Sequence, residues 1–252
     1  MCHSRSSGGP DVPEDGQLPF LLVHGLVISS LYMVPLGECL AEHAAVHAVD
    51  LPGFGLTDGP PRAPSVEALA DALTHWMDAA DLPACHVVGN SLGCEIAVSL
   101  AARHPGRVGS LILVGPTVGP DHGEFWNQFG RILWDIPHEP WTLIFNHVID
   151  HWRAGLRRAW GMIRQMLRHD MFQDLPRVQA PTLVLRGAWD PIVIDRWIEE
   201  AARLLPQGEA HSMKVGWHCV HYSHPREVAG EISAFLKRLS AGIVPASHDR
   251  PR

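Results

Sequence analysis

The sequence predicts an α/β fold in which helices cover both faces of a mostly parallel sheet. Short apolar runs bounded by Gly, Pro or Asp recur along the chain, and helix-like stretches separate most of them. Apolar runs of this length are typical of strands buried on both faces, and strands that alternate with helices indicate a doubly wound sheet. The alternation stops between residues 116 and 180, where apolar and aromatic residues recur at helical spacing. We therefore expect an α/β core with a helical insertion.

Outside the insertion, six strands and five helices are predicted. The strands are expected at residues 19–23, 45–49, 85–88, 110–114, 181–185 and 210–215. The helices are expected at residues 32–42, 66–80, 92–104, 195–205 and 225–239. These elements give a doubly wound sheet of about six strands.

The predicted domain organisation has a core, a cap and two flexible ends. The core comprises residues 18–115 and 181–239, and the helical cap comprises residues 116–180. Residues 1–17 and 240–252 lack periodicity and are rich in turn-forming or charged residues, so both ends are predicted to be flexible. In one interpretation the cap helices are amphipathic, with their tryptophans packed on the core and their arginines exposed to solvent. In the other, the cap lines a pocket. The residues concerned are Trp126, Trp134, Trp141, Trp152, Trp160, Arg131, Arg153, Arg157, Arg158, Arg164 and Arg168.

Composition excludes several classes of protein. The chain has 252 residues, 46% of them hydrophobic, which suits one large domain or one domain with an insertion. Its net charge of −7 comes from scattered residues, so nucleic acid is not expected as a partner. No apolar run reaches the ~18 residues that a membrane span needs, and the N-terminus lacks the apolar core of a secretory signal. Five cysteines without C-x-x-C spacing suggest neither a disulfide framework nor a zinc site, so we expect a cytoplasmic protein.

The run Gly89-Asn90-Ser91-Leu92-Gly93 joins the predicted strand 85–88 to the predicted helix 92–104. G-x-S-x-G between a strand and a helix is typical of a nucleophile elbow. Side chains at positions 89 and 93 would collide with the neighbouring backbone in so tight a turn. The turn would present Ser91 at the helix N-terminus, where N–H groups favour negative charge. The alternative is a Ser-Gly turn that only caps the helix.

A serine nucleophile needs a histidine to take its proton and a carboxylate to orient that histidine. In this architecture the partners follow in the order Ser, acid, His, each on a loop after a later strand. Asp190 follows the strand 181–185 and His218 follows the last strand, so we predict them as the acid and the base. The rival histidines are His211, His221 and His224.

The oxyanion hole is predicted to use two backbone N–H groups. One belongs to Leu92, the residue after the nucleophile, and the other to Leu26 after the first strand, with Val27 as its alternative. His24 is expected to be a hydrogen-bonded residue of that loop rather than a base. Contacts with the substrate are predicted for His24, Gly25, Trp126, Trp134 and Trp217.

Taken together, these runs resemble the α/β-hydrolase superfamily over about residues 18–239. The matching runs are Val23-His24-Gly25, Asp50-Leu51-Pro52-Gly53-Phe54-Gly55, the elbow, residues 181–191, and Gly216-Trp217-His218 with His224-Pro225 after it. The resemblance implies Ser91 as nucleophile, Asp190 as acid, His218 as base, the N–H groups of Leu26 and Leu92 as oxyanion donors, and a helical cap at residues 116–180.

The sequence departs from the family pattern in two places. Members usually begin with two further strands, so the sheet is expected to be the eight-strand type without its first two. Cys94 and Glu95 stand where members often have a small and then a neutral residue. Glu95 lies one turn into the helix and is predicted to be a structural hydrogen-bond partner rather than a catalytic acid.

The predicted function is hydrolysis of a carboxylic ester or lactone through a Ser-His-Asp triad and an acyl-enzyme. One alternative is carbon–carbon bond hydrolysis of aromatic ring-cleavage products, because the elbow resembles theirs and arginines could hold a carboxylate. A cofactor-free perhydrolase is also compatible with the triad, whereas a haloalkane dehalogenase would need a carboxylate in place of Ser91. A non-catalytic ligand receptor is the alternative outside enzymology. No metal or cofactor is implied, and the expected partner is a small-molecule substrate of a monomer or homodimer, without membrane or nucleic acid.

Overall fold

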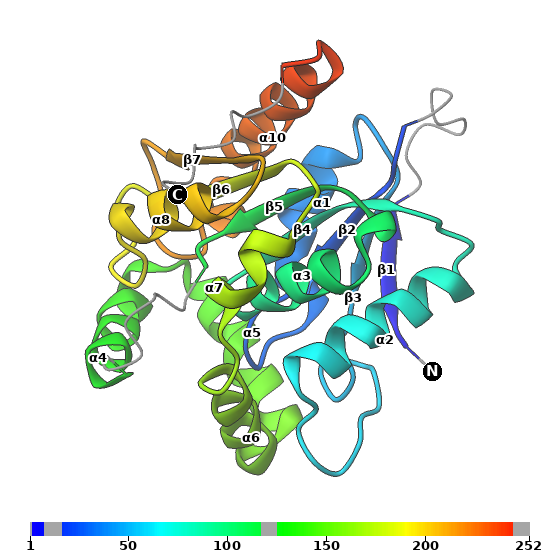
Figure 1. The fold of residues 1–252 in the computed structure, drawn as a ribbon. Helices are drawn as coiled ribbons and strands as arrows, with labels where there is room; N and C mark the ends of the chain where they lie inside the picture. Colours follow the sequence, from blue (N-terminus) through cyan, green and yellow to red (C-terminus); the bar gives the residue numbers. More distant parts are fainter. Residues whose placement is uncertain (1, 8–16, 117–124, 244–252) are drawn as a thin grey trace.

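A seven-stranded sheet forms the centre of the computed structural model, which describes residues 2–7, 17–116 and 125–243 (Figure 1). The strand order is β1-β3-β2-β4-β5-β6-β7; β1 is antiparallel to β3 and every other pair is parallel. The strands are β1 (Ser4–Ser7), β2 (Phe20–Val23), β3 (Val46–Val49), β4 (Cys85–Asn90), β5 (Val108–Val114), β6 (Thr182–Arg186) and β7 (Gly208–Ser212). The predicted class, a mostly parallel α/β sheet, is confirmed.

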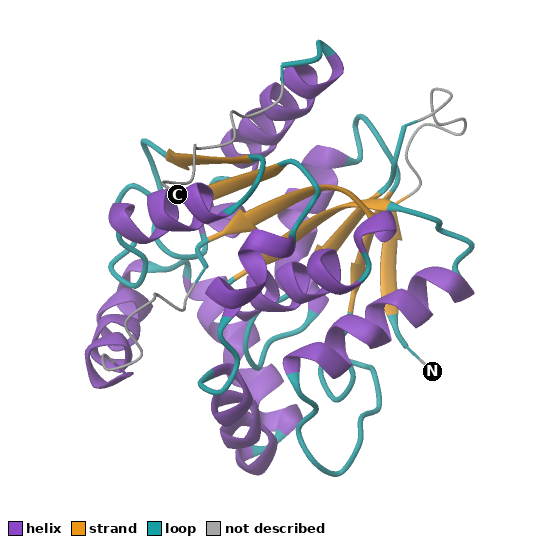
Figure 2. Ribbon diagram, in the orientation of Figure 1, coloured by secondary structure: helices purple, strands orange, loops and turns teal. Residues whose placement is uncertain are grey.

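Helices cover both faces of this sheet (Figures 1 and 2). One apolar core lies between the sheet and α2, α3 and α8, and a second lies between the sheet and α1, α9 and α10. The helices of the α/β core are η1 (Ser30–Met33), α1 (Val34–Leu40), α2 (Val66–Ala79), α3 (Leu92–Arg103), η2 (Pro105–Arg107), α8 (Asp195–Leu204), α9 (Val220–Ser223) and α10 (Pro225–Ser240). The five predicted helices of the core are confirmed, the first of them as η1 followed by α1.

Burial explains why the central strands were readable from the sequence. All four residues of β2 and all five of β6 are buried, so each strand is a continuous apolar or nearly apolar run. The edge strand β7 is half-exposed and polar, and it begins where Gly208 pairs with Thr182. Strand β7 ends at Ser212, three residues before the predicted end. Residues 213–217 form the loop that leads to His218.

Strand β1 lies in the segment 1–17, where the sequence indicated no strand. Its residues are Ser-Arg-Ser-Ser, without an apolar run, because it is an edge strand whose side chains are half-buried or exposed. Contacts outside the strand hold it: the buried carboxylate of Asp50 lies 3.0 Å from Nδ1 of His3 and also accepts the N–H groups of Ser30 and Leu56. The observed sheet thus has one strand more than the six expected.

Between β5 and β6, the described residues are helical and contain no strand. We call residues 125–177 the helical insertion: α4 (Phe125–Asp135), η4 (Ile136–His138), α5 (Trp141–Ala154), α6 (Leu156–Met166), α7 (Met171–Asp174) and η5 (Leu175–Arg177). In Figure 1 its helices α4, α5 and α6 lie below the sheet.

Side chains of the helical insertion contact loops at the carboxyl edge of the sheet. Asp150 accepts a hydrogen bond from the N–H of Ser29 at 2.8 Å, in the loop after β2. Arg158 donates to the carbonyl oxygens of Gly53 and Pro60, in the loop after β3, at 2.7 and 3.0 Å. The helical insertion is therefore attached to two of the loops that follow parallel strands.

Several expectations concern residues outside the described part of the chain. The predicted flexible segments 1–17 and 240–252 include residues 8–16 and 244–252, which lie outside it, and so do residues 117–124 of the predicted cap. Among the described residues, no helix combines the length and the hydrophobicity that crossing a membrane requires.

Candidate active site

The elbow after β4 holds Ser91 in a strained backbone conformation. Ser91 has φ 57° and ψ −124° between the end of β4 and the start of α3. A serine with positive φ is uncommon, and such strain is stored where the surrounding structure enforces it. The two glycines allow the turn: a Cβ on Gly89 would lie 2.4 Å from the carbonyl oxygen of Gly93, and one on Gly93 would lie 2.3 Å from that of Val23. The steric reason predicted for both glycines is therefore present.

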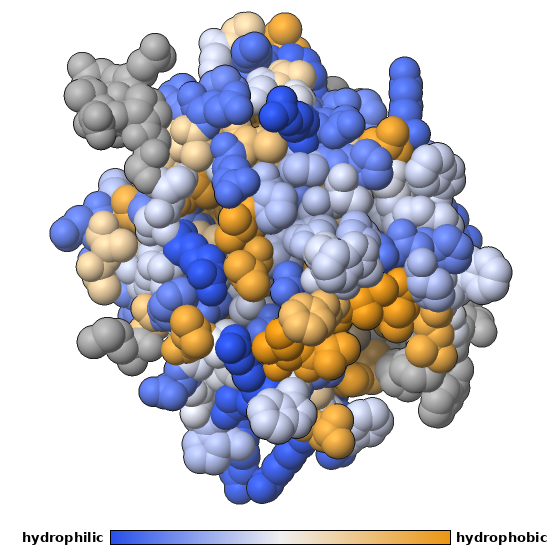
Figure 3. Space-filling view, turned by 180° about the vertical axis from the view of Figure 1, so that it is seen from behind, coloured by the Kyte–Doolittle hydropathy of each residue, from blue (hydrophilic) through white to orange (hydrophobic). Residues whose placement is uncertain are grey.

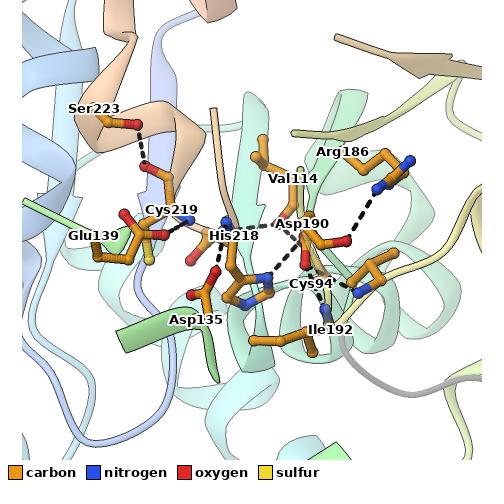
Figure 4. Close-up of polar contacts among 12 residues, drawn as sticks. Cys94, Val114, Asp135, Glu139, Arg186, Asp190, Ile192, His218, Cys219 and Ser223 are labelled. Atoms are coloured by element: carbon orange, nitrogen blue, oxygen red, sulfur yellow. Dashed lines mark hydrogen bonds and ion pairs between the residues drawn. The ribbon is translucent and has the colours of Figure 1, made fainter. Parts of the chain in front are cut away.

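Asp190 and His218 form a buried pair (Figure 4). Nδ1 of His218 lies 2.9 Å from Oδ2 of Asp190, and Oδ1 of Asp190 accepts the N–H groups of Ile192 and Val193 at 2.8 and 3.0 Å. Both oxygens of the carboxylate are thus engaged, which fixes its orientation. Burial alone would lower the pKa of His218, but the charge and hydrogen bond of Asp190, together with two more carboxylates, raise it to about 9.

Ser91 and His218 flank the same two residues at the end of β5. The N–H of Ser91 donates to the carbonyl oxygen of Val114 at 3.2 Å. The next residue, Gly115, has φ 60°, and a Cβ placed on it would lie 3.0 Å from Cε1 of His218. Consecutive Cα atoms are about 3.8 Å apart, so the structure brings the elbow and the His218–Asp190 pair to one place on the sheet.

The rival histidines have other partners. His221 is fully buried against the ring of Tyr32, and burial lowers its pKa to about 3. His211 pairs with Glu231 at 3.6 Å, and His224 contacts the hydroxyl of Ser223 at 3.0 Å. Of the four candidates, His218 is the one bonded to Asp190.

Two backbone N–H groups next to Ser91 are available as donors. Within the described residues, the N–H groups of Leu26 and Leu92 donate to no protein acceptor. The loop that carries Leu26 approaches the elbow closely, since a Cβ on Gly25 would lie 3.2 Å from Cβ of Ser91. Val27, the alternative donor, has φ 50° in the same loop. This geometry suits an oxyanion hole between the two loops.

A buried polar network supports the loop after β2. The hydroxyl of Tyr32 accepts the N–H of Gly25 at 2.6 Å and donates to Oδ1 of Asn90 at 2.8 Å. Nδ2 of Asn90 donates to the carbonyl oxygen of Val114 at 2.9 Å. Neither Tyr32 nor Asn90 was predicted as a site residue, because pairing between distant polar residues leaves no periodic signal in the sequence.

His24 holds the same loop from its other side. It is fully buried; its Nε2 accepts the N–H of Leu51 at 3.0 Å, and its Nδ1 lies 2.9 Å from the carbonyl oxygen of Gly25. Burial lowers the pKa of His24, so the ring is neutral, with its proton on Nδ1. These contacts favour a structural role over direct contact with a substrate.

Replacement of Tyr32 by phenylalanine is expected to destabilise the fold and to slow catalysis. The N–H of Gly25 and the amide of Asn90 would both lose a buried partner, which costs ~1–3 kcal/mol per group. Urea unfolding and kcat on an ester substrate measure the two effects. Tyr222→Phe is the matched control, since that hydroxyl makes one half-buried bond to Thr142. Equal stability of both variants would contradict a supporting role for the Tyr32 network.

Two carboxylates that the sequence analysis missed come from the helical insertion. Oε1 of Glu139 accepts the N–H of Cys219 at 2.6 Å, and Oδ1 of Asp135 lies 3.5 Å from the N–H of His218 (Figure 4). Both side chains are buried. The signal available beforehand was a pair of acids four residues apart at a helix end, which usually indicates a solvated surface.

The predicted tryptophans are brought together in part. The ring centroids of His138 and Trp217 are 4.0 Å apart in a stacked arrangement, and the ring of Trp134 lies 5.7 Å from that of His138. Trp189, next to the proposed acid, lies 6.1 Å from Trp217. This aromatic cluster joins the helical insertion to the loops after β6 and β7. Residue 126 is in α4, but its side chain lies outside the described part of the chain.

The two residues after the elbow, where the sequence departs from the family pattern, are both buried. The thiol of Cys94 donates to the carbonyl oxygen of Gly89 at 3.2 Å. Oε2 of Glu95 lies 3.3 Å from Nδ1 of His169, whose Nε2 is 3.3 Å from Asp174. Burial raises the pKa of Glu95 to about 7. Glu95 thus links α3 to the end of the helical insertion, in keeping with a structural partner.

Comparisons with known proteins agree with this fold and site. The family model described as alpha/beta hydrolase fold matches residues 19–139. The chain is 40% identical to a pimeloyl-[acyl-carrier protein] methyl ester esterase of Aeromonas hydrophila, over 92% of this chain and 97% of that protein. It is 30% identical to the enzyme of the same name from Chromobacterium violaceum, over 91% and 95%.

Solved structures show the same architecture. An esterase from Thermogutta terrifontis superposes with a TM-score of 0.78 at 22% identity, covering 94% of this chain and 93% of the other. The full-length relatives, the family model and the shared fold lead to one conclusion. The chain belongs to the α/β-hydrolase family and is a hydrolase whose relatives are carboxylic ester hydrolases.

Proposed function

We propose that this hydrolase cleaves carboxylic esters with Ser91 as nucleophile, His218 as general base and acid, and Asp190 as the carboxylate that orients His218. The observation that carries the proposal is the position of the strained elbow beside the buried His218–Asp190 pair at the end of β5. The esterase relatives support the choice of bond and favour an enzyme over the ligand-receptor alternative.

The reaction proceeds by acyl transfer in two steps. Oγ of Ser91 attacks the carbonyl carbon while Nε2 of His218 takes the hydroxyl proton, and the N–H groups of Leu26 and Leu92 bind the oxyanion. The tetrahedral intermediate expels the alcohol, which receives the proton from His218. Water then gives a proton to His218 and attacks the acyl-enzyme, which forms a second tetrahedral intermediate. When this intermediate collapses, Oγ of Ser91 leaves, receives the proton from His218, and the acid is released.

The helical insertion acts as the cap of this site in our proposal. It bonds to the loops after β2, β3 and β7, which are the loops around the elbow. Trp217 of the cluster with Trp134 and His138 directly precedes His218 in the chain, and in our proposal its ring contacts the acyl or alcohol group.

The relatives also suggest that the ester is carried on an acyl carrier protein. Between residues 141 and 168 the charged side chains are five arginines and Asp150, which is buried against Ser29. Helices α5 and α6 therefore expose positive charge although the whole chain has a net charge of −7. They also expose large apolar side chains: Trp141, Phe145, Val148, Trp152, Leu156, Trp160 and Leu167.

In the view from behind, hydrophobic residues gather in the lower half of the molecule, the half that holds the helical insertion (Figure 3). A basic surface with exposed aromatic rings fits an acidic carrier protein, which would present its acyl chain to the site beneath the cap.

Reversing two charges on α6 tests this substrate class. Arg157→Glu with Arg164→Glu is expected to raise KM for a carrier-bound methyl ester by about tenfold and to leave kcat/KM on a short p-nitrophenyl ester unchanged. Arg203→Glu with Arg226→Glu, on α8 and α10, is the matched control. A KM for the carrier-bound ester that does not change in the α6 variant would refute carrier docking while leaving ester hydrolysis intact.

Carbon–carbon bond hydrolysis is the second candidate from the sequence. The exposed arginines of the helical insertion would bind a carboxylate-bearing substrate equally well, but the full-length relatives are esterases. Comparison of kcat/KM for a methyl ester and for an aromatic ring-cleavage product separates the two. Faster turnover of the ring-cleavage product would overturn the ester assignment.

We also propose a cytoplasmic location, on the evidence of the thiols. All five cysteines are free, and Cys85, Cys94 and Cys219 are buried. Unpaired thiols suit a reducing compartment.

A further inference from the structure

We propose that Asp135 and Glu139 are positioning residues through which the helical insertion holds the His218 loop and acts on the His218 imidazole. The proposal rests on the function proposed above. It concerns two side chains outside the Ser91, Asp190 and His218 set, and they come from the helical insertion rather than from the α/β core.

The contacts show how these carboxylates hold the loop. Glu139 accepts the N–H of Cys219 at 2.6 Å, and Asp135 lies 3.5 Å from the N–H of His218. The two residues are buried, with 8% and 5% of their surfaces exposed. The short bond to Glu139 and the longer contact with Asp135 act on two consecutive N–H groups, so together they restrain the backbone that carries the imidazole.

The carboxylates also act on the histidine through their charge. Burial raises the pKa of Glu139 to about 7 and raises the pKa of Asp135, partly offset in each by His218. Oε2 of Glu139 is buried beside Asp135 and Cys219, and the carboxyl becomes negatively charged as the pH rises above its pKa of about 7. That charge favours the protonated form of His218, as does the charge of Asp190.

The ionisable groups around this pair come from four segments of the chain, the fourth being α9 with His221. His218 and Cys219 lie after β7, Asp190 lies after β6, and His147 lies on α5. Burial raises the pKa of the Cys219 thiol well above its ordinary value and lowers that of His147 to about 4, so both are neutral near pH 7. His221, with its pKa lowered to about 3, is neutral as well. In the range where His218 titrates, above the pKa of about 7 of Glu139, the charges that act on His218 are therefore those of Asp190, Asp135 and Glu139.

The sign of the effect follows from these charges. Removal of two negative charges lowers the pKa of His218, so the neutral base becomes available at lower pH. Asp135→Asn with Glu139→Gln keeps an oxygen acceptor for each backbone N–H. We expect this variant to shift the rising limb of the kcat/KM profile to lower pH by about one unit. At a fixed pH on that limb, kcat/KM should therefore be about tenfold higher than in the wild type. The plateau itself should change little.

A second variant separates positioning from charge. Glu139→Ala leaves the N–H of Cys219 without an acceptor and is expected to lower kcat on the plateau by about tenfold, with Glu139→Gln restoring it. Glu38→Gln with Glu42→Gln removes two exposed charges from the α1 region and is the matched control, expected to change neither property.

The decisive measurement is the titration of the His218 imidazole by NMR in the full-length protein, with the resonance assigned by comparison with His218→Gln. A lower pKa in the Asn/Gln variant than in the wild type and in the control supports the proposal. An unchanged pKa of His218 would overturn it. The titration needs no catalytic activity, so this result stays separate from the outcome of any test of Ser91 as nucleophile.

Discussion

Replacement of Ser91 by alanine is expected to lower kcat/KM on a short p-nitrophenyl ester by at least ~10⁴-fold. The residual rate would come from the oxyanion donors and from substrate binding, which the substitution leaves in place. We expect a loss of this size because, among the described residues, no other hydroxyl could replace that of Ser91. Ser91 stands just before α3 and lies beside both Gly25 and Val114. Initial rates under conditions of excess enzyme measure the loss.

Ser99→Ala is the matched control for this substitution. Ser99 is fully buried two turns further along α3, and its hydroxyl has no hydrogen-bond partner among the described residues. Its loss should therefore change neither stability nor rate. If Ser91→Ala had the same kcat/KM as Ser99→Ala, Ser91 would not be the nucleophile.

Replacement of Asp190 by asparagine is expected to lower kcat by about 10³–10⁴-fold without unfolding the protein. The reason lies in the two bonds that Oδ1 of Asp190 accepts from the N–H groups of Ile192 and Val193. An asparagine oxygen would keep those two donors, which turns the NH₂ group toward Nδ1 of His218. Nδ1 must then accept a hydrogen bond, so the proton moves to Nε2 and the ring can no longer take the proton of Ser91.

The control for this variant is Asp195→Asn, at the start of α8. Asp195 accepts from Arg186 and Ser212 and makes no contact with His218. It should retain the wild-type kcat. A kcat for Asp190→Asn within a factor of about three of the wild type would mean that another group orients His218.

The parts of the fold that were predictable from sequence are those with a periodic or local signal. The fully buried strand β2 is a continuous apolar run, β6 has an apolar centre, and the elbow carries its two glycines within five residues of sequence. Strand β1 has no such signal, since its residues are polar and its partners are the backbone of β3 and the side chain of Asp50. An edge strand of this kind depends on residues more than forty positions away.

The candidate site divides in the same way. Ser91, Asp190 and His218 follow strands, so topology was enough to place them in one region. Tyr32 bonds to Gly25 and Asn90, and Asp135 and Glu139 contact backbone N–H groups about 80 residues away. These contacts depend on how the helical insertion and the loops fold over the sheet. Nothing local distinguishes such residues from a core tyrosine or a solvated acid.

Covalent labelling of the intact protein by a fluorophosphonate, followed by peptide mass mapping, tests Ser91 as nucleophile most directly. We predict one adduct, on Ser91, with complete loss of esterase activity at one equivalent, no adduct in Ser91→Ala, and slow labelling in Asp190→Asn. Full esterase activity with Ser91 unmodified, or inactivation through an adduct on a different residue, would contradict the account.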